Sequence, residues 1–199
     1  MLLGIVEFGT RLERDFYARD PREVAPELLG KILVHGQVAG TIVEVEAYCG
    51  TIDPGAHTFG GRTPRNATMF EPGGHLYVYF SYGMHWCANA VCGDAGDGVA
   101  VLLRALAPVS GVETMHQRRG AAARREKDLC SGPAKLAQAL GIGAEHDGVD
   151  LVTHPSLTIV DPGGVPPASI VQTTRIGLSK GAESPWRWYV EGDPNVSRR

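Results

Sequence analysis

The sequence predicts an α+β fold, a single mixed domain on a curved, mostly antiparallel β-sheet with flanking helices. The chain has 199 residues and no visible linker, so one core suits it better than two. Hydrophobic residues make up 43% and charged residues 21%, the balance of a globular protein that buries most of its apolar surface. The expected elements do not alternate regularly between strand and helix, which argues against a doubly wound parallel sheet. We therefore expect residues 1–199 to form one domain, with loosely ordered ends.

The first half of the chain is expected to hold one short helix and three strands. Residues 26–30 begin with proline and end with glycine, a pattern typical of a short helix. Residues 32–34 and 41–48 have the composition of strands. In the second of them the period of two places Glu44, Glu46 and Tyr48 on one face, so two carboxylates and a tyrosine share a surface. The aromatic-rich residues 76–80 form the third strand.

The second half is expected to begin with a strand over residues 99–106, opened by a glycine and ended by a proline. Ser110 and Glu113 have the spacing of a capping box, which predicts a helix that Gly120 ends. A further helix is expected over residues 133–140, with a glycine after it. The chain then returns to strands at 170–176 and 186–190, separated by a glycine-containing loop.

Neither the start of the chain nor any later stretch has the pattern of a membrane or secretion segment. The first residues lack the basic region and long apolar run of a signal, and no run approaches the roughly 18 apolar residues of a membrane span. Four cysteines, Cys49, Cys87, Cys92 and Cys130, form no Cys-x-x-Cys pair, and a domain of this size does not need disulfides. We therefore expect a cytoplasmic protein with reduced, packed thiols and no membrane partner.

Charge is distributed unevenly along the chain, although the net charge is only -3. Residues 104–135 hold seven basic and three acidic side chains, a balance of +4, whereas residues 143–167 carry four acidic side chains and no Lys or Arg. A negative net charge argues against a phosphate-rich partner, and a basic segment permits one. The distribution removes the objection to nucleic-acid binding without establishing it.

Glu46 is the first candidate for catalysis, since it stands near the end of its strand and just before a loop. One strand carboxylate is more often solvated than catalytic, so its surroundings must carry the argument. His57 follows, and then the loop Gly60-Gly61-Arg62-Thr63-Pro64-Arg65-Asn66, whose glycines, arginines and hydroxyl suit a phosphate backbone. An ordinary polar loop is the alternative interpretation.

Aromatic and polar residues further along the chain suit a pocket for a flat base. Tyr77 and Tyr79 have the pattern of core tyrosines, but a nucleobase pocket needs aromatic walls. Tyr82 stands at a glycine-relieved turn, where it has room to fill the gap left by a flipped base. Asn89 and Arg104 lie in or beside apolar runs, so each needs a hydrogen-bonding partner.

Taken together, these residues closely resemble the alkyladenine, or 3-methyladenine, DNA glycosylase family of the mammalian type. The resemblance covers about residues 28–197 and rests on several motifs in one order. They are Val45-Glu46-Ala47-Tyr48, His57 with the loop at 60–66, Leu76-Tyr77-Val78-Tyr79, Tyr82-Gly83-Met84, Cys87-Ala88-Asn89, Leu102-Leu103-Arg104-Ala105, residues 130–136 and Tyr189-Val190.

The resemblance implies a DNA-repair glycosylase that flips an alkylated or deaminated purine out of duplex DNA and hydrolyses its N-glycosidic bond. Glu46 would activate the water and Arg104 would support it. Tyr48, His57, Tyr79 and Asn89 would form the base pocket, with Asn89 excluding guanine. Tyr82 would intercalate, and Thr63, Arg65 and Met84 would lie near the DNA. The implied protein is a monomer that needs no metal or other cofactor, and it is nucleoid-associated if the source is bacterial.

Three departures from the mammalian pattern bear on pocket shape and DNA contacts. His85-Trp86 stands where mammalian relatives carry two other aromatics, and Ala88 is smaller than the usual residue there. The segments after Gly120 and near Gly143 are shorter. The chain also shows no lysine beside Glu46 to form a Schiff base, so strand cleavage is not expected.

Two other functions remain as alternatives. A zinc hydrolase would use His57, His85, Cys87 and Cys92, although their spacing fits no common zinc motif. A nucleic-acid-binding module without catalysis would use the same arginines and tyrosines but would not need Glu46.

Overall fold

The computed structural model describes residues 8–81 and 83–197, and they form an α+β domain around one antiparallel sheet. The strand order is β1-β7-β2-β3-β6-β5-β4, β9 pairs with β3, and β8 pairs with β9. The strands are β1 (Thr10–Arg11), β2 (Ile32–His35), β3 (Val38–Tyr48), β4 (Leu76–Ser81), β5 (His85–Cys92), β6 (Val99–Ser110), β7 (Leu157–Asp161), β8 (Ile170–Thr173) and β9 (Arg187–Val190). The predicted fold class is confirmed, whereas the expectation about the chain ends falls on residues outside the described part.

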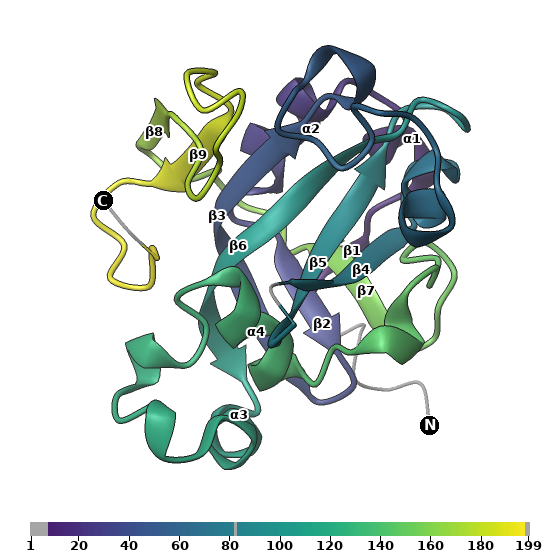
Figure 1. Ribbon diagram of the computed structural model, residues 1–199. Coiled ribbons are helices and arrows are strands. Elements are labelled where there is room, and N and C mark those ends of the chain that lie inside the picture. The colour runs from purple at the N-terminus through teal and green to yellow at the C-terminus, as the bar shows by residue number, and fades with distance from the viewer. Residues whose placement is uncertain (1–7, 82, 198–199) are drawn as a thin grey trace.

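Within the described residues, four α-helices lie around the sheet, and short 3₁₀ turns complete the connections. The helices are α1 (Arg14–Tyr17), α2 (Pro21–Leu28), α3 (Val112–Arg119) and α4 (Pro133–Leu140). The 3₁₀ turns are η1 (Gly50–Ile52), η2 (Pro64–Phe70), η3 (Gly120–Ala122), η4 (Glu126–Asp128) and η5 (Ala144–His146). Figure 1 shows β8 and β9 beside β3 at one side of the molecule, with α3 and α4 next to each other near the lower end of β6.

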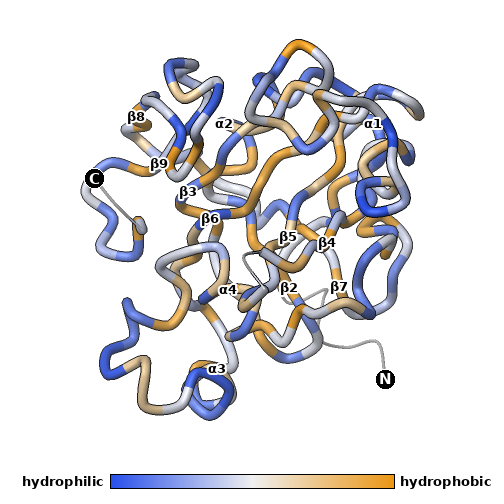
Figure 2. Tube along the Cα trace, viewed as in Figure 1, coloured by the Kyte–Doolittle hydropathy of each residue, from blue (hydrophilic) through white to orange (hydrophobic). Residues whose placement is uncertain are grey.

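The core lies between the sheet and the helices packed on it. α2 packs on β3 and β6, and α4 packs on β5 and β6. Leu28, Leu103, Leu136 and Leu140 are fully buried members of this core. Figure 2 shows hydrophobic stretches along the strands of the sheet, β5 and β6 among them. Buried side chains of β3, β5 and β6 belong to this core, so the site described below lies on packed strands.

Two helix starts differ from the expectation. Asp20 caps α2 by accepting the Arg22 N–H at 2.8 Å, and Pro21 fills the first turn, so residues 26–30 are only its last turn and exit. The prediction of a capping box at Ser110 is wrong, since Ser110 ends β6 and its hydroxyl donates to the Gln37 carbonyl. Gly111 caps α3 instead, with φ of +70°, and a Cβ there would stand 2.6 Å from Val38.

Four elements were not expected from the sequence: β1, α1, β5 and β7. β5 shows no alternation of buried and exposed residues, because its residues from Cys87 to Cys92 are all buried, so a pattern of period two does not predict it. β3 and β6 also run further than expected, and Pro108 is accommodated opposite Gly40, next to a bulge in the pairing. These long paired strands fix the relative positions of the side chains from β3 and β6 that form the candidate active site.

Candidate active site

β3 lies in the interior of the sheet, and this position removes its two glutamates from solvent. β6 pairs along one edge of β3, and β9 pairs with residues 44–46 along the other. Glu44 and Glu46 are each 0% exposed. A lone strand carboxylate is usually solvated, but these two are buried because β9, from the far end of the chain, pairs with this part of β3.

Arg104 connects the two glutamates. Its Nε donates to Oε1 of Glu44 at 3.0 Å, and its Nη1 lies 3.1 Å from Oε2 of Glu46. Nε of Arg187 donates to the same Glu44 oxygen at 2.7 Å. Glu44 also accepts the backbone N–H of Ser197 at 2.7 Å. Two carboxylates and two guanidinium groups thus balance one another in a buried site, which charges require when water is excluded.

The carboxylate of Glu46 is held by three donors. Oε1 accepts the backbone N–H of Ile176 at 2.7 Å, and Oε2 accepts the Tyr48 hydroxyl at 3.0 Å as well as Nη1 of Arg104. Burial raises the pKa of Glu46 above its ordinary value, although Arg104, the Ile176 amide and Tyr48 all oppose the rise. The Glu46 carboxylate is therefore poised to accept a proton more readily than an exposed glutamate.

The pKa of Glu44 is shifted in the opposite direction from that of Glu46. Burial alone would raise its pKa, but Arg104, Ser197 and Arg187 outweigh burial and lower it. Glu44 thus stays ionised to a lower pH than an exposed glutamate does, and it orients Arg104. The two acids on one strand face have different environments, and such a difference separates a structural carboxylate from a candidate base.

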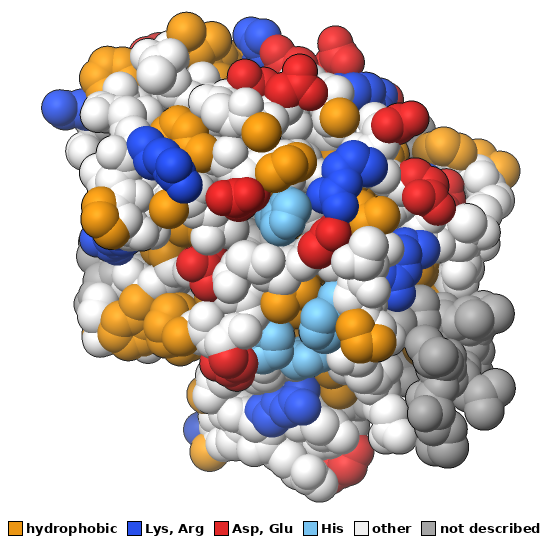
Figure 3. All heavy atoms as spheres, turned by 90° about the vertical axis from the view of Figure 1, so that its right-hand side faces the viewer, with side chains coloured by type: hydrophobic (Ala, Val, Ile, Leu, Met, Phe, Trp, Pro, Cys, Tyr) orange, Lys and Arg blue, Asp and Glu red, His pale blue; other side chains and the backbone are white. Residues whose placement is uncertain are grey.

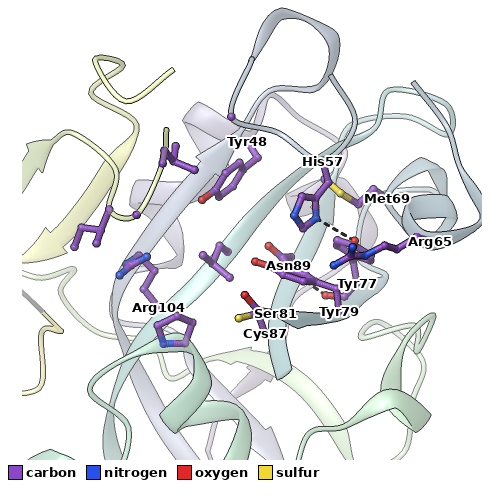
Figure 4. A pocket seen from close by; sticks show the side chains of 16 residues that line it. Tyr48, His57, Arg65, Met69, Tyr77, Tyr79, Ser81, Cys87, Asn89 and Arg104 are labelled. Carbon is purple, nitrogen blue, oxygen red and sulfur yellow. Dashed lines mark hydrogen bonds between the residues drawn. The ribbon is translucent and has the colours of Figure 1, made fainter. Parts of the chain in front are cut away.

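A pocket of about 450 Å³ opens in front of these groups. Tyr48, Arg104 and Ile176, the three groups that bond Glu46, all line it, so the carboxylate lies one side chain beneath the wall. Figure 4 shows His57, Tyr77 and Tyr79 on the side opposite Tyr48 and Arg104. The pocket is within the size range of small-ligand sites and has aromatic walls with a few polar groups.

The opposite wall is a group of ring contacts. The His57 and Tyr79 ring centroids are 4.5 Å apart, and Tyr79 stacks on Tyr77 at 5.4 Å. Nδ1 of His57 lies 3.2 Å from the Tyr77 hydroxyl. Partial burial and the nearby Arg65 lower the pKa of His57, which favours a neutral ring. Below this wall, Nδ2 of Asn89 donates to the Tyr77 carbonyl at 3.1 Å.

Comparison with known proteins decides the family. The methylpurine-DNA glycosylase (MPG) family model matches residues 15–194. The chain belongs to the methylpurine-DNA glycosylase family. A relative from Burkholderia lata, named "Putative 3-methyladenine DNA glycosylase", is 56% identical over 191 residues, covering 95% of this chain and 92% of the relative. A relative of the same name from Rhodopseudomonas palustris strain BisB18 is 50% identical over 193 residues, covering 97% and 94%.

Membership of the methylpurine-DNA glycosylase family makes the protein an enzyme that acts on DNA bases and assigns it to base-excision DNA repair. The structure brings together the six residues expected at catalytic and pocket positions. They are Glu46, Arg104, Tyr48, His57, Tyr79 and Asn89, of which all but the buried Glu46 line the pocket directly. In this glycosylase the pocket is thus built mainly on β3, β4, β5 and β6, and η2, the start of α4 and the loops after η1 and β8 complete it.

Of the residues expected near DNA, Arg65 lines the pocket, whereas Thr63 and Met84 do not. Thr63, Arg65 and Met84 are exposed, with Met84 at 67%. Nη2 of Arg65 donates to the Phe80 carbonyl at 3.1 Å, so it also holds the end of β4. Tyr82, expected to intercalate, lies outside the described residues.

Sequence reasoning did not find the role of the loop that follows β8. Ile176 bonds Glu46 through its backbone N–H, which no side-chain motif can reveal. Leu178 from the same loop lines the pocket. Asn66, 3% exposed, was read only as part of a polar loop, yet its Nδ2 donates to the His57 and Gly61 carbonyls. Its polar side chain in a glycine-rich loop was the one available signal.

Further observations concern the cysteines, possible metal sites, membrane-spanning helices and surface charge. All four cysteines are free and buried, as the expectation of packed thiols requires. Within residues 8–81 and 83–197, no group of three or more His, Cys, Asp or Glu side chains is arranged to hold a metal ion. No helix in the described part is long and apolar enough to cross a membrane.

On the face shown in Figure 3, acidic and basic side chains are interspersed rather than separated.

Proposed function

We propose that the protein removes alkylated or deaminated purines from duplex DNA by hydrolysing the N-glycosidic bond with a water molecule that Glu46 activates. The observation that carries the proposal is the Glu46 carboxylate, held by three donors directly behind an aromatic-walled pocket. The printed names of the relatives, which specify 3-methyladenine DNA glycosylase, support an alkylated purine as substrate.

A purine buried in a duplex reaches such a pocket only after it has rotated out of the stack. Rotation costs a few kcal/mol, and it costs least for a damaged or mispaired base. We propose that Tyr48, His57 and Tyr79 hold the extruded base by stacking and hydrogen bonding, which contributes roughly 1–3 kcal/mol per stacked ring. An alkylated purine also carries positive charge, which aromatic faces attract. Tyr82 would fill the vacated stack, and Thr63, Arg65 and Met84 would contact the DNA around it.

The Glu46 carboxylate is proposed to act on water and on the sugar. A carboxylate offers roughly four lone-pair positions. Within the described residues, one is used on Oε1 and two on Oε2. The remaining position on Oε1 is proposed for the attacking water, which reaches it only when the pocket wall opens, because the Glu46 side chain is 0% exposed. As the base departs, the sugar develops oxocarbenium character, and the nearby negative charge stabilises it.

We propose that Arg104 keeps the Glu46 carboxylate ionised. Without a cation, burial would favour the protonated form of Glu46, which accepts no proton from water. Arg104 is itself fixed by Glu44, so the two carboxylates have separate tasks. The reaction needs no Schiff base in this scheme, so it leaves an intact strand with an abasic site. All of these groups belong to one chain, which suits a monomer.

The test is base release from synthetic duplexes, each carrying one 3-methyladenine, 7-methylguanine, hypoxanthine or ethenoadenine. The purified protein is expected to release free base from at least one of them, and the strand should break only after alkali treatment. If the protein binds the duplexes but releases base from none of them, the result would instead support the non-catalytic nucleic-acid-binding module. Strand breakage without alkali would contradict a glycosylase that lacks lyase activity.

A further inference from the structure

A buried ion pair between Arg175 and Asp53 lies beside the candidate active site and is not used by the chemistry proposed above. Both side chains are 0% exposed. Nη1 of Arg175 lies 2.5 Å from Oδ2 of Asp53, and Nη2 lies 2.7 Å from Oδ1. Asp53 follows η1 and Arg175 follows β8, so the pair joins two loops that are distant in the sequence. A two-pronged guanidinium–carboxylate contact fixes orientation as well as distance.

Arg175 also contacts the pocket wall. Its guanidinium carbon lies 4.8 Å from the ring centroid of Tyr48 and 5.0 Å from that of Trp186. Nη1 donates to the carbonyl of Ala47 at 3.0 Å, which is the residue between Glu46 and Tyr48. The guanidinium therefore touches both the backbone and the ring at the end of β3.

The same side chain holds the loop that follows it. Nη2 donates to the Gly181 carbonyl at 2.9 Å. Gly181 has φ of +62°, and a Cβ there would lie 3.1 Å from Nη2 of Arg175 and 3.2 Å from Oδ1 of Asp53. The loop is thus wrapped closely around the pair. Ile176, the next residue after Arg175, donates its backbone N–H to Oε1 of Glu46 at 2.7 Å.

We propose that Arg175 and Asp53 form a positioning pair, which places the Ile176 amide on the Glu46 carboxylate and fixes the Tyr48 wall of the pocket. The inference rests on the proposed function of Glu46 as the base. Neither residue touches the substrate. They act through Ile176 and Tyr48, and their loss misplaces a donor and a wall rather than removing a reacting group.

The Arg175→Lys variant keeps the charge but loses the fork and the flat face, so it isolates the positioning role. When the Ile176 amide no longer bonds Oε1, the anionic form of Glu46 is less stable and its pKa rises. Around Glu46 there remain Arg104 from β6, Arg187 from β9, Tyr48 and Glu44 from β3, and Tyr79 from β4. Base release should then require a higher pH, by about one to two pH units for one lost hydrogen bond to a charged group.

The experiment measures single-turnover base release as a function of pH, using a duplex with one 7-methylguanine, whose positive charge removes the need to protonate the leaving base. Arg175→Lys and Asp53→Asn are compared with wild type, and Arg14→Lys is the control, because Arg14 pairs with Asp150 at 2.7 Å outside the pocket. Duplex affinity and melting temperature are measured on the same preparations. Hydrogen exchange of the Ile176 amide is followed by NMR as a readout that does not depend on activity.

Arg175→Lys is expected to shift the acid limb of the rate profile upward, and both pair variants are expected to lower the plateau rate about tenfold or more and to speed exchange of the Ile176 amide. Duplex affinity should change less than the rate. The Arg14→Lys control should change only the melting temperature. An unchanged pH profile and an unchanged Ile176 exchange rate in folded Arg175→Lys would overturn the positioning role. If wild type itself releases no base, the proposed function fails, and amide exchange alone then decides whether the pair positions Ile176.

Discussion

Nη1 of Arg104 lies 3.1 Å from Oε2 of Glu46, and the two side chains are 8% and 0% exposed. An ion pair in such a dry place is not an efficient source of stability, because desolvation cancels much of the attraction. The pair does oppose protonation of the acid. Burial raises the pKa of Glu46, and the Arg104 guanidinium is the strongest influence that opposes the rise. The pair therefore determines the pH range in which Glu46 accepts a proton.

Replacing Arg104 by Gln should move the pH range of activity upward. The pKa of Glu46 loses its main lowering influence and rises, so a larger fraction of the acid is protonated at a given pH. Base release should fall at neutral pH and recover partly as pH increases. Single-turnover rates on a 7-methylguanine duplex between acid and alkaline pH check this. A uniform loss at every pH would show that Arg104 acts on the substrate and not on Glu46.

Glu44→Gln should lower the free energy of unfolding of the protein. Glu44 bonds Arg104, Arg187 and Ser197 in a buried site. Removing one partner of such a network costs roughly 3–5 kcal/mol. Urea unfolding at neutral pH measures the difference in free energy.

The pH dependence of that difference has a defined sign. The folded pKa of Glu44 is lowered, so its contribution to the free energy of unfolding is fully present above the unfolded value of about 4.3. It is lost as pH falls through the lower folded value. Wild type and Glu44→Gln should therefore converge in stability under acid conditions. A gap that stays constant down to acid pH would show that the ionised form of Glu44 is not what stabilises the fold.

Asn89→Ser should weaken discrimination against guanine. Asn89 is 4% exposed, lines the pocket and is fixed by its bond to the Tyr77 carbonyl, so its side chain has little freedom to move aside. Shortening it makes room for the purine amino group. Guanine release relative to hypoxanthine should rise by roughly tenfold, as for one small group in a fitted pocket. Asn195→Ser is the control, because Asn195 is also buried and hydrogen-bonded but does not line the pocket. An unchanged ratio would leave Asn89 with a structural role only.

Activity should persist in EDTA. The proposed route uses a carboxylate and a flipped base, and the described residues hold no cluster arranged as a metal site. Base release is measured before and after dialysis against the chelator. Loss of activity that zinc restores would revive the hydrolase interpretation of His57, His85, Cys87 and Cys92.

The sequence was sufficient for residues whose place follows from local pattern. The period of two in β3 correctly places Glu44, Glu46 and Tyr48 on one face, since Arg104 bonds both acids and Tyr48 bonds Glu46. α4 also follows its pattern, with proline at its start and Gly141 past its end. These features depend on a few neighbouring residues, so a single sequence contains them.

What the sequence does not contain are contacts between distant segments. The covering of β3 by β9 joins residues 44 and 189, and the pair Asp53–Arg175 joins loops 122 residues apart. Asp53 beside Pro54 reads as an ordinary turn residue, and a backbone amide such as that of Ile176 has no sequence signature. The motif residues were therefore predictable, whereas the groups that hold them in place were not.

The most direct test of the central claim is base release by Glu46→Gln. The variant keeps the size of the side chain but removes its ability to accept a proton, so single-turnover release should fall by about 10² to 10⁴ while lesion-duplex affinity is retained. Glu44→Gln, corrected for its folded fraction, serves as the matched control and should retain much more activity. A Glu46→Gln enzyme that releases base at a rate near wild type, with Glu44→Gln inactive, would contradict the assignment of Glu46 as the base.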